Sequence, residues 1–111
     1  MPILLSAFAD EAAQDLEGQI QALVANQVPG IELRTVDSVN VADFDSTMTA
    51  RVKTALDQAS LKVHCLATPL GKVQIDSPLA PELERLKRLS QTAHALDCQS
   101  LRIFSFYVQY R

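Results

Sequence analysis

Polar side chains stand near the C-terminal ends of several apolar segments, where they could do chemistry. Glu32 and Arg34 lie two positions apart in one segment, and His64 lies in the next. Lys72 comes shortly after that second segment, and Ser105 lies in the last one. A carboxylate and an imidazole can exchange protons with a substrate, whereas Arg and Lys bind phosphate or carboxylate groups. These five residues are therefore candidates for contact with a small substrate.

Each of these side chains also has a purely structural explanation, which the sequence leaves open. Glu32 and Arg34 would point to one face of a strand, so they can form an ion pair with each other or with neighbouring strands. His64 is flanked by apolar residues, which is typical of a hydrogen-bonded core histidine. Lys72 fits a mobile surface lysine equally well, and Ser105 is small enough to serve packing alone.

For three further polar residues we expect purely structural roles. Asp10 and Glu11 follow the first apolar segment, where acidic residues support the start of a helix. His94 falls within a predicted helix, and we expect it on the solvated surface.

Four short apolar segments predict strands. They are Ile3–Phe8, Gly30–Arg34, Leu61–Ala67 and Leu101–Phe106. Their starts at residues 3, 30, 61 and 101 are separated by 27, 31 and 40 residues, which is the spacing that repeated βα units require. Their apolar residues point to both faces, as in a parallel sheet that helices cover.

Three amphipathic helices are expected between these strands. Asp15 is the expected N-cap of the first helix, which Pro29-Gly30 closes. The second begins near Asp45-Ser46, and the third has Pro81 at its first position. The predicted apolar faces contain Leu16, Ile20, Leu23 and Val24, then Met48, Val52, Leu56 and Ala59, then Leu83, Leu86, Leu89, Ser90, Ala93 and Leu96. On the third helix, the residues expected to face water are Glu82, Glu84, Arg85, Lys87 and Arg88.

These patterns predict an α/β fold with a parallel (βα) repeat, and two architectures compete for it. One is an open doubly wound sheet, and the other is a section of a (βα)8 barrel. The chain has 3 glycines and contains neither a GxGxxG turn nor a GxxxxGK[ST] phosphate loop. A nucleotide-binding function is therefore disfavoured.

Length and charge narrow the class of protein further. The 111 residues suit a single domain over residues 1–111, and 48% of them are hydrophobic. The net charge of -3, without a Lys/Arg cluster, disfavours nucleic acid as a partner. No apolar stretch is long enough for a signal peptide or a membrane span, so we expect no membrane partner. Cys65 and Cys98 are isolated, which favours reduced thiols and a cytoplasmic protein.

Four motifs, in order, resemble the start of a known family. The first strand is followed by SAFADE, the second contains GIELRTVDSVNV, the third contains KVHCLATPLGKVQID, and the fourth is LRIFSFY. From about Ile3 to Tyr107 the sequence resembles the sugar phosphate isomerase/epimerase group, the xylose-isomerase-like barrels. The resemblance implies a TIM barrel of roughly 250 to 300 residues. This chain would then supply the N-terminal half of that barrel.

The resemblance also implies a reaction. It is proton transfer next to the carbonyl of a sugar or sugar phosphate, assisted by a divalent metal such as Mn, Mg or Zn. In these barrels the metal ligands, usually two Glu, an Asp and a His, come mainly from later strands. We therefore expect no cofactor and no activity in this chain alone, and we assign no catalytic residue. The expected substrate-binding residues are Glu32, Arg34, His64, Lys72 and Ser105.

Two alternatives remain open. The chain could be a catalytically silent α/β binding or structural domain. An apurinic-endonuclease-like barrel would need a His near the end of the fourth strand, where Ser105 stands, and more than the 2 histidines present. In either barrel, half of a closed sheet leaves two open edges, so we expect either self-association through them or a rearranged terminal segment.

Overall fold

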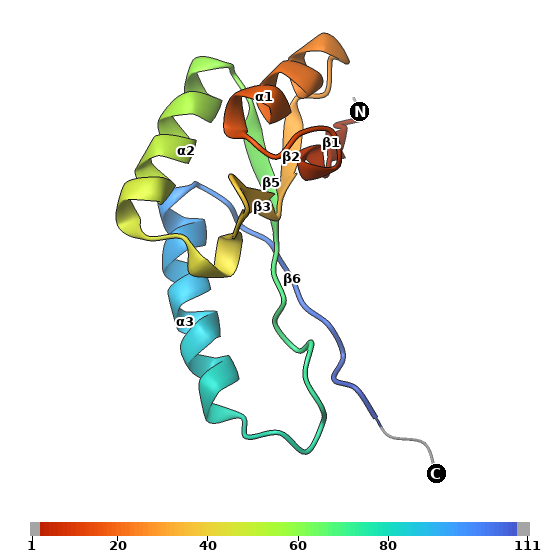
Figure 1. The fold of residues 1–111 in the computed structure, drawn as a ribbon, viewed down its shortest axis with the longest axis vertical. Helices are drawn as coiled ribbons and strands as arrows, with labels where there is room; N and C mark the ends of the chain where they lie inside the picture. Colours follow the sequence, from red (N-terminus) through yellow and green to blue (C-terminus); the bar gives the residue numbers. More distant parts are fainter. Residues whose placement is uncertain (1–2, 109–111) are drawn as a thin grey trace.

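The computed structural model describes residues 3–108 and contains a four-stranded parallel sheet (Figure 1). The strands lie side by side in the order β1 (Ser6–Ala7), β2 (Gly30–Leu33), β5 (Lys62–Ala67) and β6 (Leu101–Arg102). All three pairings between neighbours are parallel. The predicted α/β class with a parallel sheet is therefore confirmed.

Three helices connect consecutive strands of this sheet: α1 (Leu16–Ala25), α2 (Ser46–Gln58) and α3 (Ala80–Ala95). The carboxylate of Asp15 accepts a hydrogen bond of 3.0 Å from the amide of Gly18, and that of Asp45 accepts one of 2.7 Å from Met48. Both residues are N-caps, because their side chains satisfy amides that have no partner within the helix. Asp15 was the predicted cap, and Asp45 is one of the two candidates at the start of the second helix. Pro81 lies in the first turn of α3, where its missing amide hydrogen is not needed.

The hydrophobic core lies between one face of the sheet and the helices. Ile31, Leu33 and Leu66 supply its sheet side, and all three are fully buried. The helices supply Leu23, Val52, Leu56 and Leu89. Because side chains alternate along a strand, Glu32 points to the opposite face, away from this core.

The first strand is shorter than the predicted Ile3–Phe8. Its partner β2 begins only at Gly30, whose amide donates a hydrogen bond of 3.1 Å to the carbonyl oxygen of Leu5. Within residues 3–108, Ile3 and Leu4 therefore have no strand beside them, and Ile3 is 88% exposed. These apolar residues flank the open edge of the sheet.

The last strand is also shorter than predicted, because the chain changes its pairing partner after Arg102. Residues 70–75 and 104–107 form a two-stranded arm that extends away from the sheet (Figure 1). Three backbone hydrogen bonds join it: Phe104 N to Leu70 O at 2.7 Å, Ile75 N to Tyr107 O at 2.8 Å, and Tyr107 N to Val73 O at 2.8 Å.

A small antiparallel hairpin, which the sequence patterns did not predict, follows β2. It consists of β3 (Thr35–Val36) and β4 (Val39–Asn40). Asp37 and Ser38 form its turn with φ values of 53° and 65°, and two positive φ angles are what a type I′ turn requires. Strands of two residues are too short to give an alternating pattern. Two short 3-10 helices, also not predicted, are η1 (Ala9–Glu11) and η2 (Val41–Asp43).

The first part of helix α3 turns a different face to the core than predicted, whereas Leu89, Ala93 and Leu96 are buried as predicted. Glu82 is 8% exposed, whereas Leu83 and Leu86 are 54% and 39% exposed, so the predicted orientation of this first part of the helix is wrong. The reason is a hydrogen bond of 2.9 Å from the amide of Gly71 to the carboxylate of Glu82. Val24 of α1, predicted on the apolar face, is likewise exposed.

Three simpler predictions can be checked directly. Cys65 and Cys98 are both free thiols, as expected. His94 is exposed on α3, also as expected. Among the helices of residues 3–108, none has both the length and the apolar character that crossing a membrane requires.

Candidate functional site at the carboxyl ends of the strands

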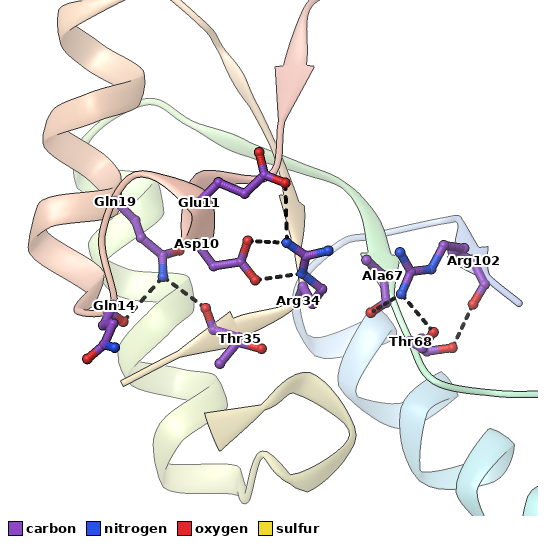
Figure 2. A network of polar contacts seen from close by, with 9 residues as sticks. All are labelled: Asp10, Glu11, Gln14, Gln19, Arg34, Thr35, Ala67, Thr68 and Arg102. Carbon is purple, nitrogen blue, oxygen red and sulfur yellow. Dashed lines mark hydrogen bonds and ion pairs between the residues drawn. The ribbon is translucent and has the colours of Figure 1, made fainter. Parts of the chain in front are cut away.

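The carboxyl ends of the four parallel strands meet at one edge of the sheet, and polar side chains gather there. Asp10 lies in η1 just after β1, Arg34 directly follows β2, and Thr68 directly follows β5. Arg102 is the last residue of β6. We call these four residues the strand-end cluster, and Figure 2 shows them together.

Arg34 forms a two-point ion pair with Asp10. Its Nε and Nη2 atoms each donate a hydrogen bond of 2.7 Å to the Asp10 carboxylate, and Glu11 lies 3.7 Å from Nη2 (Figure 2). The hydrogen bonds to Asp10 are the largest cause that raises the pKa of the Arg34 guanidinium above its ordinary value. Arg34 thus pairs with a neighbouring segment and not with Glu32. Asp10 and Glu11 hold Arg34, whereas the N-terminus of α1 is capped by Asp15.

Glu32 forms a hydrogen bond with the first strand and not with Arg34. The hydroxyl of Ser6 donates a hydrogen bond of 2.6 Å to Oε1 of Glu32. Cys65 lies opposite Glu32 on the neighbouring strand β5. Burial is the largest cause that raises the pKa of the Cys65 thiol, and the negative charge of Glu32 is the next. A carboxylate offers about four acceptor positions, so Glu32 can accept further hydrogen bonds from the hydroxyl groups of a ligand.

His64 lies nearer the amino ends of the strands than the strand-end cluster. Its ring packs over Gly30, the first residue of β2, where an added Cβ would be 2.7 Å from Cε1 of the imidazole. The β2–β5 register shifts here, from Ile31↔Val63 to Glu32↔Cys65, so His64 is the extra residue of a bulge. It also borders a cavity of about 240 Å³ lined by Leu61 and Asp97, among others. The structure therefore does not bring His64 together with the cluster.

Lys72 is exposed in the loop after β5, and the preceding residue fixes that loop. Gly71 has φ +78°, and a Cβ there would be 2.0 Å from the carbonyl oxygen of Phe104. Only glycine fits this close approach of two backbones. Lys72 is thereby held beside the segment that follows β6, with Nζ 5.4 Å from the centre of the Phe104 ring.

Ser105 lies one residue beyond Phe104 and is exposed. It belongs to the two-stranded arm and not to β6, so it stands beyond the end of the sheet.

Arg102 and Thr68 complete the cluster, and sequence reasoning missed both. Nη2 of Arg102 donates hydrogen bonds of 3.3 and 3.2 Å to the carbonyl oxygens of Ala67 and Thr68 (Figure 2). The hydroxyl of Thr68 donates one of 2.6 Å to the carbonyl oxygen of Arg102 and accepts one of 3.1 Å from Leu70. A charged residue one position after Leu101, inside an otherwise apolar segment, is the signal that could have identified Arg102.

Two aromatic rings separate three cations in a row along this edge. Arg34 lies 4.6 Å from the ring centre of Phe8, and Arg102 lies 5.8 Å from the same ring. Arg102 is also 4.6 Å from the ring centre of Phe104, beside Lys72. We call these five residues the cation–aromatic row. Phe8 follows one edge strand and Arg102 belongs to the other, so the row joins the two edges of the sheet.

No family model, curated protein or solved structure matches this chain.

The described residues do not suit a metal centre. Within residues 3–108, no three His, Cys, Asp or Glu side chains are grouped so that they could hold a metal ion. A groove of about 710 Å³ lies elsewhere, where η2 and α2 meet α3, and it contains Thr49, Lys53 and Arg88. The strand-end cluster contains the guanidinium groups of Arg34 and Arg102, the carboxylate of Asp10 and the hydroxyl of Thr68, and the chemistry of these groups is that of hydrogen bonds and charge.

Proposed function

We propose that this chain is a four-strand arc of a sugar phosphate isomerase/epimerase barrel and that it contributes to substrate binding. The observation that carries this proposal is the strand order β1-β2-β5-β6. Each new parallel strand is added on the same side of the preceding one, and the order never reverses. A doubly wound sheet needs such a reversal, because its ligand lies at the point where the strand order changes direction.

The connections support the same conclusion. Right-handed crossovers are the rule for parallel βαβ units, and when successive strands advance in one direction they place all helices on one face. In Figure 1, α2 and α3 lie together on the left of the strands. Glu32 points to the opposite face, where its carboxylate accepts a hydrogen bond from the hydroxyl of Ser6. In a (βα)8 barrel the helices cover the outer face of the strands and the other face lines the interior of the barrel, so this arrangement is compatible with a section of its wall.

The position of the strand-end cluster supports a substrate site. In βα barrels the active site is built at the carboxyl ends of the strands. Asp10, Arg34 and Arg102 lie at those ends, with Lys72 close by. Among the residues predicted for substrate binding, Arg34 and Lys72 thus lie nearest to the proposed site, and Glu32 lies deeper along β2.

The contribution of this chain would be binding and not proton transfer. The resemblance implies a divalent metal in the complete barrel, but the donor groups within residues 3–108 do not fit one. We therefore assign to these residues no step that depends on a metal. Glu32 and the strand-end cluster would orient the hydroxyl groups of a sugar, because carboxylates and guanidinium groups form directed hydrogen bonds.

A titration followed by NMR tests this function. Fructose and fructose 6-phosphate are added to the ¹⁵N-labelled 111-residue chain, and glycerol at equal concentration serves as the control. We expect amide shifts at residues 6–10, 32–35 and 102–104, together with no exchange of the sugar C–H protons in D₂O. Glu32→Gln should weaken the binding, and Glu84→Gln, an exposed carboxylate of α3, should not.

Three outcomes would contradict the proposal. The absence of sugar-induced shifts would remove the substrate class. Shifts confined to the groove where α2 meets α3 would place ligand binding away from the strand ends. Exchange of sugar protons by this chain alone would overturn the assignment of binding without catalysis.

We also propose that the chain self-associates through the open edges of its sheet. Ile3, Leu4 and Leu5 lie beside the β1 edge and are 88%, 69% and 55% exposed. Ile103 and Phe106, which follow β6, are 67% and 37% exposed. Exposed apolar side chains beside unpaired strand edges favour pairing with another chain.

A further inference from the structure

Two cations of the cation–aromatic row approach the same ring. Arg102 lies 4.6 Å and Lys72 lies 5.4 Å from the ring centre of Phe104. A cation over an aromatic face is attracted to it, yet the ring carries no net charge and does not neutralise the cation. The positive charge of both residues therefore remains available to a ligand.

The neighbouring carboxylates do not balance this charge. Asp10 and Glu11 both pair with Arg34 at the other end of the row. In the part of the chain that the structure describes, no carboxylate oxygen lies within 4.0 Å of a side-chain nitrogen of Arg102 or Lys72. The Phe104 end of the row thus has an excess of positive charge.

The guanidinium group of Arg102 is held in place, but not all of its N–H groups form hydrogen bonds. Its hydrogen bonds to the carbonyl oxygens of Ala67 and Thr68 fix the guanidinium group. Its Nε is buried and has no hydrogen-bond partner among the described residues. Buried donors are nearly always paired in folded proteins, so this one calls for a partner from outside the described residues, such as a water molecule or a bound group.

We propose that Arg102 and Lys72, beside Phe104, bind the oxyanion of a sugar-derived ligand, either a phosphate or a carboxylate group. The guanidinium group would provide directed hydrogen bonds, and the lysine would provide a second charge on a flexible stem. The inference rests on the proposed function for the sugar part of the ligand. Oxyanion binding itself can be measured separately with inorganic phosphate.

The test is a set of titrations of the ¹⁵N-labelled 111-residue chain, followed through the amide signals of Gly71, Lys72 and Phe104. The probes are inorganic phosphate, glucose 6-phosphate, gluconate and glucose. We expect phosphate and glucose 6-phosphate to shift these signals, and glucose to bind at least about tenfold more weakly than glucose 6-phosphate because it lacks the charged group. A response to gluconate would extend the site to carboxylates, whereas its absence would assign the site to phosphate.

Matched variants locate the site. Arg102→Gln and Lys72→Gln should each weaken phosphate binding about five- to tenfold, the effect of losing one charge-assisted contact. Arg88→Gln and Lys87→Gln remove the same charges from exposed positions of α3 and should leave the affinity unchanged. The dispersion of the NMR spectrum shows whether Arg102→Gln folds. If it does not fold, Lys72→Gln still tests the site, because Lys72 is exposed and its replacement should not disturb the fold.

The possible results separate this inference from the proposed function. Equal phosphate affinity in Lys72→Gln and Lys87→Gln would overturn the oxyanion site. Equal affinity for glucose and glucose 6-phosphate would also overturn it while leaving the sugar-binding function in place. A third result is possible, in which the chain binds inorganic phosphate, Lys72→Gln loses that binding, and no sugar binds. This result would support the oxyanion site and overturn the proposed function.

Discussion

The main-chain amide of Gly71 donates a hydrogen bond of 2.9 Å to the buried carboxylate of Glu82. This contact ties the loop after β5 to the first turn of α3, and it positions Lys72 beside Phe104. A buried carboxylate in a helix is unusual, and here it serves the loop, because without it the amide of Gly71 would lack a partner.

Removal of this acceptor should destabilise the protein. We expect Glu82→Ala to lower the free energy of unfolding by about 1 to 3 kcal/mol, the range for leaving a buried donor unpaired. Glu84→Ala, two positions away and exposed, should change it by less than about 0.5 kcal/mol. Urea unfolding followed by circular dichroism measures both, and equal stability of the two variants would disprove the anchoring role of Glu82.

The contact between Gly30 and His64 should appear as an energetic coupling. Gly30→Ala places a methyl group against the imidazole, so it should destabilise the wild-type protein. In a His64→Ala background the added methyl group meets no ring, and we expect its effect to shrink by about 0.5 to 3 kcal/mol. A double-mutant cycle from urea unfolding curves gives this coupling, and strictly additive effects would show that the two residues do not touch.

The ion pair of Arg34 should depend mainly on one of its two carboxylates. Asp10→Asn removes the negative charge and the acceptor of one of the two short hydrogen bonds, and we expect a loss of about 1 kcal/mol in the free energy of unfolding. Glu11 is 3.7 Å away with its side chain 75% exposed, so Glu11→Gln should cost less than about 0.5 kcal/mol. A larger loss for Glu11→Gln would reverse the assignment.

The two thiols should make stability depend on alkaline pH. Burial raises the pKa of both Cys65 and Cys98 above the ordinary value of 9.0. The unfolded chain therefore releases these protons first, so the stabilising effect is complete below pH 9.0 and is lost as the pH rises through the folded-state values. We expect the Tm of the reduced protein to fall more steeply between pH 9 and 10.5 than the Tm of Cys65→Ala/Cys98→Ala. Parallel curves for the two proteins would refute the linkage.

Self-association should respond to charges placed at the sheet edge. We expect the 111-residue chain at micromolar concentration to have a mass above that of a monomer in light scattering. Leu4→Lys should shift it towards the monomer, because a charge beside an edge strand opposes pairing. Leu83→Lys introduces the same charge at an exposed leucine of α3 and should have little effect. A wild-type chain that stays monomeric throughout would rule out the edge contact.

The parts of the fold that depend on neighbouring residues in the sequence were predictable. Asp15 and Asp45 cap their helices through amides three residues ahead, so the sequence alone identified Asp15 and limited the second cap to Asp45 or Ser46. The central strands β2 and β5 were found because their apolar segments are long enough to stand out.

The missed features depend on residues that are distant in the sequence. Glu82 has the character of a surface residue, and only the amide of Gly71, brought back by the loop, explains its burial. The early end of β6 follows from the pairing of Phe104 with Leu70 in place of β5. Likewise, the pairing of Arg34 with Asp10 required the register of β1 beside β2, which no local pattern contains.

The direction of the strands has a consequence for any assembly of this chain. Since β1 and β6 are the two free edges of a parallel sheet, continuing that sheet means placing the β6 edge of one copy against the β1 edge of the next. Such a head-to-tail contact joins two different surfaces, and repetition either closes into a ring or grows into a filament. With four strands in each copy, a curvature matched to an eight-stranded barrel closes after two copies. The twist of this sheet thus decides whether its copies assemble into a closed ring or into a filament.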